Sequence, residues 1–436
     1  MERYAKYKDS GVAWIGNIPE YWNLKKLKFT ASINDESLPE TTNEFYELEY
    51  VEISNVKSGI GILETEKYFF KDAPSRARRI VRDGDVIVST VRTYLKSIAK
   101  INNPPNNLIA STGFAVVRPR LIDSGFTGFL FYSEFLIGEI ISLSTGVSYP
   151  AINASQIGCI NIPIPPLEEQ KSIAAYLDRK TAEIDELIAQ KQRLIALYEE
   201  EKTAIINEAV TKGINPDVKL KPSGIDWLGD IPEHWSTTRL NRIIRVKDGT
   251  HDTPKYTYES FDTYPLITSK DFKNNQIDFS EAKHIEKVDH LKIIQRSNTQ
   301  KNDLIMSMIG GNIGNLAFVD TDREFSIKNV ALFKTCHDYW TAKYLFFILK
   351  SPLLKIQIDL NSRGGAQGFL SLDDLRGLIY FVLPLKEQRA IAKYIEKETA
   401  RIDAKIAKTK RIIELQKEYR TALISEAVTG KIKVSN

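Results

Sequence analysis

This chain has few cysteines and methionines, and it has little excess of charge of either sign. Its 436 residues include two Cys and three Met. Two cysteines cannot make a disulfide framework, so we expect a reducing, cytoplasmic environment. The net charge is only +4, from 60 Lys and Arg against 56 Asp and Glu. Charge alone therefore does not indicate nucleic-acid binding, and any basic surface must be local.

Long apolar runs are missing as well. Residues 1–6 have no apolar core of the kind a signal peptide needs, so we expect none. The most apolar stretch, residues 344–349, is far too short to cross a bilayer. The composition, 42% hydrophobic and 10% aromatic, is that of a folded soluble protein with room for two or three domains.

The motifs of common enzyme classes do not occur. There is no G-x-x-x-x-G-K-[ST] phosphate loop, and the glycine-rich residues 310–314 lack its lysine. Asn103-Pro104-Pro105-Asn106 is similar to the Asn-Pro-Pro-aromatic motif of amino-methyltransferases, but Asn106 offers no ring for stacking a base. The histidines and cysteines show no metal-ligand spacing. We therefore predict a non-catalytic chain with no metal and no cofactor of its own.

A long stretch of the sequence is present twice. Residues 166–211 superpose on residues 384–429 without a gap, and about half of the positions are identical. Apolar residues recur at steps of three and four, and neither interior contains Pro or Gly. We predict two helices, over 167–213 and 385–431.

The predicted helices are too long to be buried on a small globule. A helix of about 44 residues is roughly 65 Å long. We predict that the two pack antiparallel as a coiled coil, and the opposite charge of the two copies favours this weakly. The alternative is two independent helices, each packed on its own domain.

A second repeat precedes each variable region. Residues 8–22 match residues 221–235, and both segments combine Gly and Pro with paired Trp. We predict a turn-rich clamp at the start of each domain, because Trp needs burial. The intervening regions mix short strands and helices, which gives an α+β fold with a pseudo-two-fold internal repeat. The predicted order is a clamp and first variable domain over 1–162, a long helix over 163–213, a second clamp and variable domain over 214–382, and a second long helix over 383–436.

Polar and basic side chains gather at predicted turns of both variable regions. Arg and Lys suit phosphates, Arg can read guanine with two hydrogen bonds, and Asn and Gln suit adenine. Turn chemistry or a solvated surface would explain the same residues. The DNA-binding candidates are Arg76, Arg78, Arg79, Arg92, Tyr94, Lys96, Ser148, Tyr149, Lys247, Thr250, His251, Asn274, Arg363 and Gln367.

The ordered double pattern resembles the specificity (S) subunit of type I restriction-modification systems. The resemblance rests on the Trp14–Trp22 and Trp227–Trp235 segments, the Pro-Leu-x-Glu-Gln helix starts and the Glu-Ala-Val-Thr helix ends. The loop Gly249–Pro254 also looks like one in that family's target-recognition domains. The resemblance implies that each variable region reads one half of a split double-stranded DNA sequence. It also implies that the helices hold the halves apart and dock two modification (M) subunits.

The same resemblance assigns all catalysis to partners. The M subunits would bind S-adenosylmethionine and methylate adenine at N6, and restriction (R) subunits would cut DNA with ATP and magnesium. A different class of function stays open on the residues alone. A coiled-coil scaffold with two protein-binding domains would confer no sequence preference on DNA.

Overall fold

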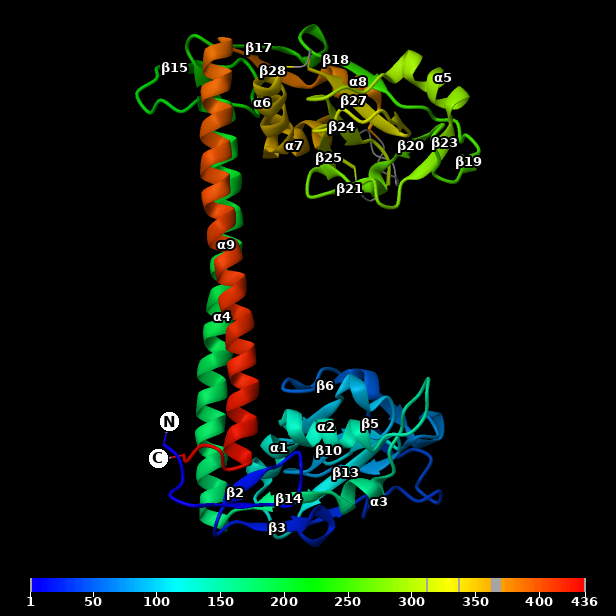
Figure 1. Cartoon of the computed structure of the whole chain (residues 1–436), viewed down its shortest axis with the longest axis vertical. Helices are drawn as coiled ribbons and strands as arrows, with labels where there is room; N and C mark the ends of the chain where they lie inside the picture. The colour runs from blue at the N-terminus through cyan, green and yellow to red at the C-terminus, as the bar shows by residue number, and fades with distance from the viewer. Residues whose placement is uncertain (1, 311–312, 336–337, 362–369, 435–436) are drawn as a thin grey trace. The chain divides into compact units, whose positions relative to one another are not determined.

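The structure is a computed structural model that describes residues 2–310, 313–335, 338–361 and 370–434 (Figure 1). The chain forms two compact units, the first comprising residues 1–192 and 410–436 and the second residues 193–409. Each unit contains one β-rich domain and a stretch of each of two long helices. The predicted α+β fold is thereby confirmed.

Short strands and helices build the first unit's domain. The strands are β1 (Tyr7–Asp9), β2 (Asn17–Pro19), β3 (Asn23–Lys26), β4 (Ala31–Ile33), β5 (Glu47–Val51), β6 (Val56–Lys57), β7 (Gly61–Ile62), β8 (Glu66–Phe69), β9 (Ala77–Ile80), β10 (Val86–Ser89), β11 (Ile98–Lys100), β12 (Leu108–Ser111), β13 (Phe114–Pro119) and β14 (Asn161–Ile164). The helices are η1 (Leu27–Phe29), η2 (Ile53–Asn55), η3 (Phe70–Asp72), η4 (Thr93–Leu95), α1 (Ser124–Tyr132), α2 (Glu134–Ser142) and α3 (Ala154–Cys159).

Two four-stranded sheets form the centre of this domain. One is antiparallel with the order β11-β10-β13-β4, and the other has the order β8-β5-β12-β9 with β12 parallel to β5. Strand β10 is buried on both faces, because Val86 and Val88 join the core under α1 and α2 whereas Ile87 joins a second core with Phe114. A continuous run of β-branched residues suits such a central strand.

The second unit's domain repeats this plan. Its strands are β15 (Leu220–Pro222), β16 (Asp230–Pro232), β17 (Ser236–Arg239), β18 (Arg245–Asp248), β19 (Tyr256–Thr257), β20 (Thr263–Ile267), β21 (Phe272–Lys273), β22 (Gln276–Ile277), β23 (Lys283–Glu286), β24 (Leu304–Ser307), β25 (Leu316–Phe318), β26 (Ser326–Ile327), β27 (Val330–Lys334) and β28 (Ile379–Val382). Its helices are η5 (Leu240–Arg242), η6 (Ser269–Asp271), α5 (Lys287–Ser297), α6 (Tyr339–Lys350), α7 (Pro352–Asn361) and α8 (Leu372–Gly377).

The order of one four-stranded sheet, and of three strands of the other, shows the internal repeat. One sheet has the order β18-β27-β24-β25, and the other has β19-β23-β20-β26 with β26 parallel to β20. Strand β24 takes the place of β10, since Leu304 and Met306 join one core and Ile305 joins the other. The duplication predicted from the long helices therefore extends through two variable regions that share little sequence.

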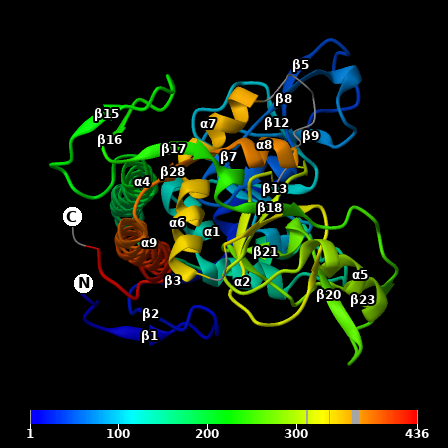
Figure 2. The same ribbon diagram turned by 90° about the horizontal axis from the view of Figure 1, so that it is seen from above.

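The long helices are α4 (Leu167–Lys212) and α9 (Leu385–Val428), and they pack antiparallel as predicted (Figures 1 and 2). In the first unit, Asp185 of α4 forms an ion pair with Arg420 of α9 at 3.0 Å. In the second unit, Lys202 of α4 pairs with Asp403 of α9 at 2.6 Å. The two pairs occupy equivalent positions of the repeat and fix one antiparallel register.

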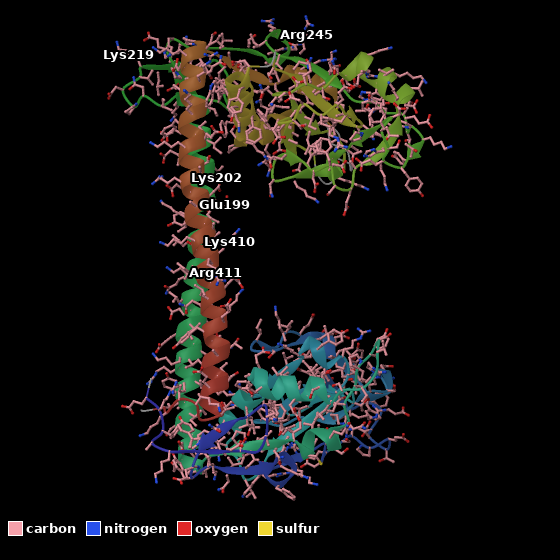
Figure 3. All side chains as sticks on the ribbon, in the orientation of Figure 1. Glu199, Lys202, Lys219, Arg245, Lys410 and Arg411 are labelled. Carbon is pink, nitrogen blue, oxygen red and sulfur yellow. The ribbon has the colours of Figure 1, made fainter. Side chains whose placement is uncertain are left out.

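The observed ends of the long helices lie within three residues of the predicted ends, and their outer faces are charged. Helix α9 ends at Val428 rather than at the predicted residue 431, because the chain turns at Thr429 and Gly430. Charged side chains cover both helices, among them Glu199 and Lys202 on α4 and Lys410 and Arg411 on α9 (Figure 3). None of the helices in the described ranges combines the length and apolar character needed to cross a membrane.

Candidate functional site

In the first domain, a turn after β10 brings several candidate residues together. The turn contains η4 and is flanked by Arg92 and Lys96, whose φ values are +49° and +54°. The Arg92 amide donates to the Pro150 carbonyl at 2.8 Å, which joins the turn to the loop of residues 145–150. This contact places five predicted residues on one surface: Arg92, Tyr94, Lys96, Ser148 and Tyr149.

This surface, the η4 surface, is unusually apolar and cationic for exposed loops. The Arg92 guanidinium lies over the Tyr149 ring, with 4.5 Å from Cζ to the ring centroid. Lys96 Nζ bonds both carboxylate oxygens of Glu134 at 2.8 Å. Leu95 is 54% exposed and Val147 is fully exposed. Exposed apolar side chains rimmed by polar groups mark an interaction surface.

The basic cluster on β9 divides into two kinds of residue. Arg76 is exposed, and the Thr112 amide donates to its carbonyl close to where Thr90 contacts Gly113, so Arg76 borders the η4 surface. Arg78 instead lies over the Phe70 ring. Arg79 donates to Ser37, and burial lowers the pKa of its guanidinium. The contacts of Arg78 and Arg79 give them structural roles, and their DNA contacts stay predictions.

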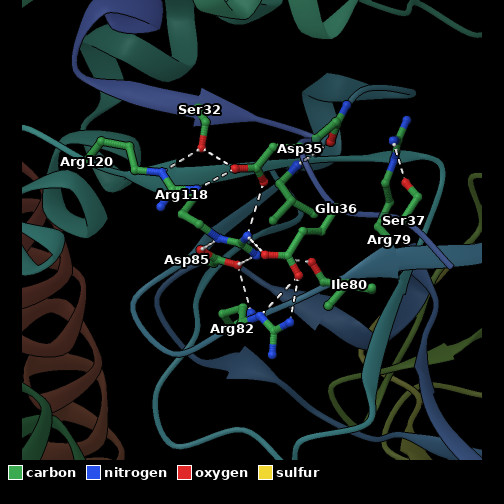
Figure 4. Close-up of polar contacts among 12 residues, drawn as sticks. Ser32, Asp35, Glu36, Ser37, Arg79, Ile80, Arg82, Asp85, Arg118 and Arg120 are labelled. Carbon is green, nitrogen blue, oxygen red and sulfur yellow. Dashed lines mark hydrogen bonds and ion pairs between the residues drawn. The ribbon is translucent and has the colours of Figure 1, made fainter.

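An ion network with a buried centre lies at the end of β10 that is opposite to the η4 turn (Figure 4). Arg118 on β13 donates to both oxygens of Asp85 at 2.9 Å and to Asp35 at 3.2 Å. The hydrogen bond with Asp85 raises the pKa of Arg118 further above its ordinary value. Glu36 bridges Arg118 and Arg82, so the exposed Arg82 guanidinium already has a carboxylate partner. In the second domain, Lys334 and Asp303 form the equivalent pair at 2.6 Å.

In the second domain, the loop of residues 249–254 is held by hydrogen bonds to neighbouring residues. Buried Asp248 accepts hydrogen bonds from Arg296 and from His251 Nε2, the latter at 3.0 Å. Burial raises the pKa of Asp248, but the bonds from Arg296 and His251 outweigh burial and lower it overall. Gly249 passes so close to β26 that an added Cβ would lie 2.4 Å from the Ile327 carbonyl oxygen. No other residue fits there without moving the strand.

A groove of about 910 Å³ lies beside this loop, and we call it the lysine groove. Its lining includes Tyr256, Asn329 and four lysines. Lys273 pairs with Asp278, whereas Lys270, Lys283 and Lys328 have no ion pair in the described part of the chain. Lys328 and Asn329 connect the groove to the loop through Thr253 and His251. Unpaired lysines along a groove suit a phosphodiester backbone.

Sequence reasoning found the loop but missed the lysine groove. Thr250 and His251 lie on the loop next to the groove, and Lys247 is half-buried on β18. Asn274 lies at the tip of the β21–β22 hairpin and lines a different groove, with Lys202 and Lys343. Arg363 and Gln367 lie outside the described residues. The three lysines without an ion pair are scattered over residues 270–328 in the sequence, and the pairing of β20 with both β23 and β26 brings their neighbourhoods together.

The described residues contain no group of three His, Cys, Asp or Glu side chains placed to hold a metal. Two repeated domains, each presenting cations and polar loops, define the class of an internally duplicated DNA-recognition protein. A family model described as "Type I restriction modification DNA specificity domain" matches the chain at residues 19–196 and 232–416. The chain belongs to this family. It is a DNA specificity subunit with two target-recognition domains, and such subunits are non-catalytic.

Several relatives carry the same description. The type I restriction enzyme EcoBI specificity subunit of Escherichia coli is 25% identical over 277 residues, which are 62% of this chain and 58% of that protein. The putative type I restriction enzyme MjaX specificity subunit of Methanocaldococcus jannaschii is 25% identical over 437 residues, 96% of both chains. Family members carry no cofactor, and their partners bind S-adenosylmethionine and ATP.

Solved structures have the same fold. A chain from a study of complex assembly and conformational transition of the type I R-M system has a TM-score of 0.76 and 22% identity, and covers 95% of this chain and 99% of its own. The HsdS subunit from Thermoanaerobacter tengcongensis has a TM-score of 0.58 and 23% identity, and covers 95% of this chain and 98% of its own.

Proposed function

We propose that each target-recognition domain reads one half of a split double-stranded DNA sequence. The first would read its half with the η4 surface and Arg76. The second would use the loop of residues 249–254 together with the lysine groove. The observation that supports this proposal is that the two domains share the order of one four-stranded sheet and of three strands of the other, yet present different side chains. Ile309, in the turn after β24, lines the lysine groove, and this turn corresponds to the one after β10. A shared frame with unlike contact residues suits two unlike half-sites.

In each domain, some residues would contact phosphates and position the DNA, and others would contact the bases. Lys270, Lys283 and Lys328 would contact phosphates, which fix register without reading sequence. Thr250 and His251, on a loop held by Asp248 and Gly249, would reach base edges. In the first domain Arg76 would contact phosphate, while Arg92, Tyr94 and Tyr149 would face the bases. Lys247, Asn274, Arg363 and Gln367 are further candidate contacts.

The long helices would set the spacing between the half-sites. Each is a single uninterrupted helix, of 46 residues for α4 and 44 for α9. The ion pairs Asp185–Arg420 and Lys202–Asp403 hold them in one register. A stiff helix pair of fixed register is suited to act as a ruler along a duplex.

The helices would also dock two copies of one modification subunit. Exposed apolar residues recur at equivalent positions: Leu167 and Leu415 in the first unit, and Leu385 and Leu197 in the second. Tyr394 is exposed and its equivalent, Tyr176, is half-buried. Two identical partners need the same surface twice, and this set provides it. Restriction subunits would join the assembly to cut DNA with ATP and magnesium, and the modification subunits would methylate adenine using S-adenosylmethionine.

Domain exchange tests the proposal. Residues 24–162 would be replaced by the corresponding region of another family member, and the chain would be assembled with purified modification subunits. Sequencing of methylated adenines should show a split motif in which one half changes and the other half and the gap are retained. A change in both halves, or methylation with no sequence preference, would contradict it. The second of these outcomes is what a protein-binding scaffold would give.

A further inference from the structure

We propose that Arg92 is a base-reading residue of the first target-recognition domain and that it reads a guanine. This inference rests on the proposed function and assigns one specificity-determining contact within it. Three observations carry it: the backbone conformation at Arg92, the residue at the equivalent position of the second domain, and the environment of the guanidinium.

The turn around η4 is a shared element of both domains. In the first domain the Ser89 amide donates to the Ser97 carbonyl at 2.9 Å, and in the second the Ser307 amide donates to the Asn315 carbonyl at 2.8 Å. Between these bonds, two of the described residues of each domain have a left-handed backbone. They are Arg92 and Lys96 in the first, with φ of +49° and +54°, and Gly310 and Gly314 in the second, both with φ of +80°.

Glycine is the residue that adopts this conformation without strain, and the second domain uses it at both corners. The first domain has the same corners with long basic side chains instead. A turn that only reversed the chain would be served better by Gly or Asn. Strain of this kind is typical of functional sites, where the side chain is required in spite of its backbone. The left-handed backbone at residues 92 and 96 therefore indicates a function for the two side chains rather than for the turn itself.

The two basic side chains differ in their availability. The Lys96 ammonium is held by Glu134 at 2.8 Å. Arg92 is exposed and has no ion pair among the described residues. Elsewhere in the domain, Arg82, Arg118 and Arg120 all contact carboxylates. Arg92 is thus the basic side chain of the η4 surface that remains free for a ligand.

Stacking on Tyr149 prepares the guanidinium for a planar ligand. The Cζ atom of Arg92 lies over the ring at 4.5 Å from its centroid, and the N–H donors of a guanidinium point outward from its edge. Guanine offers two acceptors, O6 and N7, in the major groove, and a guanidinium edge matches them with two parallel hydrogen bonds. A phosphate would accept the same donors, but a phosphate contact requires only charge and would be served by Lys as well.

The test compares Arg92→Gly and Arg92→Lys with the wild-type chain, each assembled with modification subunits. We expect Arg92→Gly to keep or raise the thermal midpoint of the chain, since it relieves the left-handed strain. Sequencing of methylated sites should show that the preference for guanine at one position of one half-site falls at least tenfold, while the other half and the gap are unchanged. Arg92→Lys should lose the same preference and retain binding. Lys67→Ala, which removes an exposed cation of the same domain, is the matched control.

Other results would overturn the inference. If Arg92→Gly weakened methylation equally on all sequences and left the guanine preference intact, Arg92 would be a phosphate contact. If Arg92→Gly lowered the thermal midpoint and left the motif unchanged, its role would be structural. A wild-type complex that showed no split motif would instead refute the proposed function, so the two failures are distinguishable.

Discussion

The indole of buried Trp22 donates its Nε1–H to Glu169 at the start of α4, at 3.2 Å. Trp235 repeats this contact with Glu387 at the start of α9, at 3.1 Å. Tyr4 and Tyr21 add hydrogen bonds to the same Glu169 carboxylate, at 2.8 and 3.0 Å. Each clamp is therefore fixed to its long helix through one carboxylate.

Removing that carboxylate should destabilise the clamp. Glu169→Ala leaves the buried Trp22 N–H without an acceptor, which costs about 1–3 kcal/mol. Glu169→Gln keeps an acceptor and should cost less. Chemical denaturation of the two variants measures the difference in free energy of unfolding. Equal stability of Glu169→Ala and the wild type would show that the clamp does not depend on this contact.

Stability should also depend on pH through His290. This buried side chain on α5 bonds Ser326 at 2.9 Å, stacks on Tyr264 and faces Glu324 at 3.7 Å. Burial lowers the pKa of His290 below its ordinary value of 6.5, with Glu324 opposing the shift. Below pH 6.5, His290 therefore binds a proton more readily in the unfolded chain than in the folded chain. The free energy of unfolding should decrease as the pH is lowered.

His290→Phe should weaken this dependence, because its ring can stack on Tyr264 but cannot be protonated. Between pH 8 and pH 5, the thermal midpoint of the wild-type chain should fall by more than the midpoint of the variant. Parallel curves over the whole range would show that His290 does not titrate on unfolding.

The lysine groove predicts a salt effect on DNA binding. Replacing Lys270, Lys283 and Lys328 with Ala should weaken binding of the assembled complex about equally on all sequences. The slope of log affinity against log salt should become shallower by up to about 0.9 for each phosphate that a lysine no longer neutralises. Lys292→Ala, an exposed lysine of α5 outside the groove, serves as the control. An unchanged slope would exclude phosphate binding in this groove.

Sequence patterns predicted the two long helices well, because these helices are repeated in the sequence and depend on local residue spacing. Helical spacing over a stretch whose interior has no Pro or Gly predicted α4 almost to the residue. The antiparallel pairing followed from an apolar stripe too long for one domain. The helical spacing and the length of the apolar stripe can both be read from the sequence without knowing any contact between distant residues.

The contact surfaces were predicted only in part, since they depend on contacts between distant segments. Arg92 and Tyr149 were both candidates. Nothing in the sequence indicates that the Arg92 guanidinium lies over the Tyr149 ring, or that the backbone at Arg92 is left-handed. The lysines of the lysine groove come from separate strands and loops of the second domain. Conversely, Arg78 and Arg79 stand in a dense basic run that looks like a binding patch, yet the fold gives both of them internal partners.

The length of the helix pair tests the account's central claim most directly. Residues 192–198 of α4 lie between Asp185 and Lys202 in the sequence, and residues 407–413 of α9 lie at matching positions between Asp403 and Arg420, the partners of these residues in the two ion pairs. Deleting both heptads shortens the pair by about 10 Å and keeps nearly the same helix faces, since seven residues are almost two turns. At about 3.4 Å per base pair, methylated-site sequencing should show the gap between half-sites reduced by about three base pairs with both halves unchanged. An unaltered gap in an active complex would contradict the account.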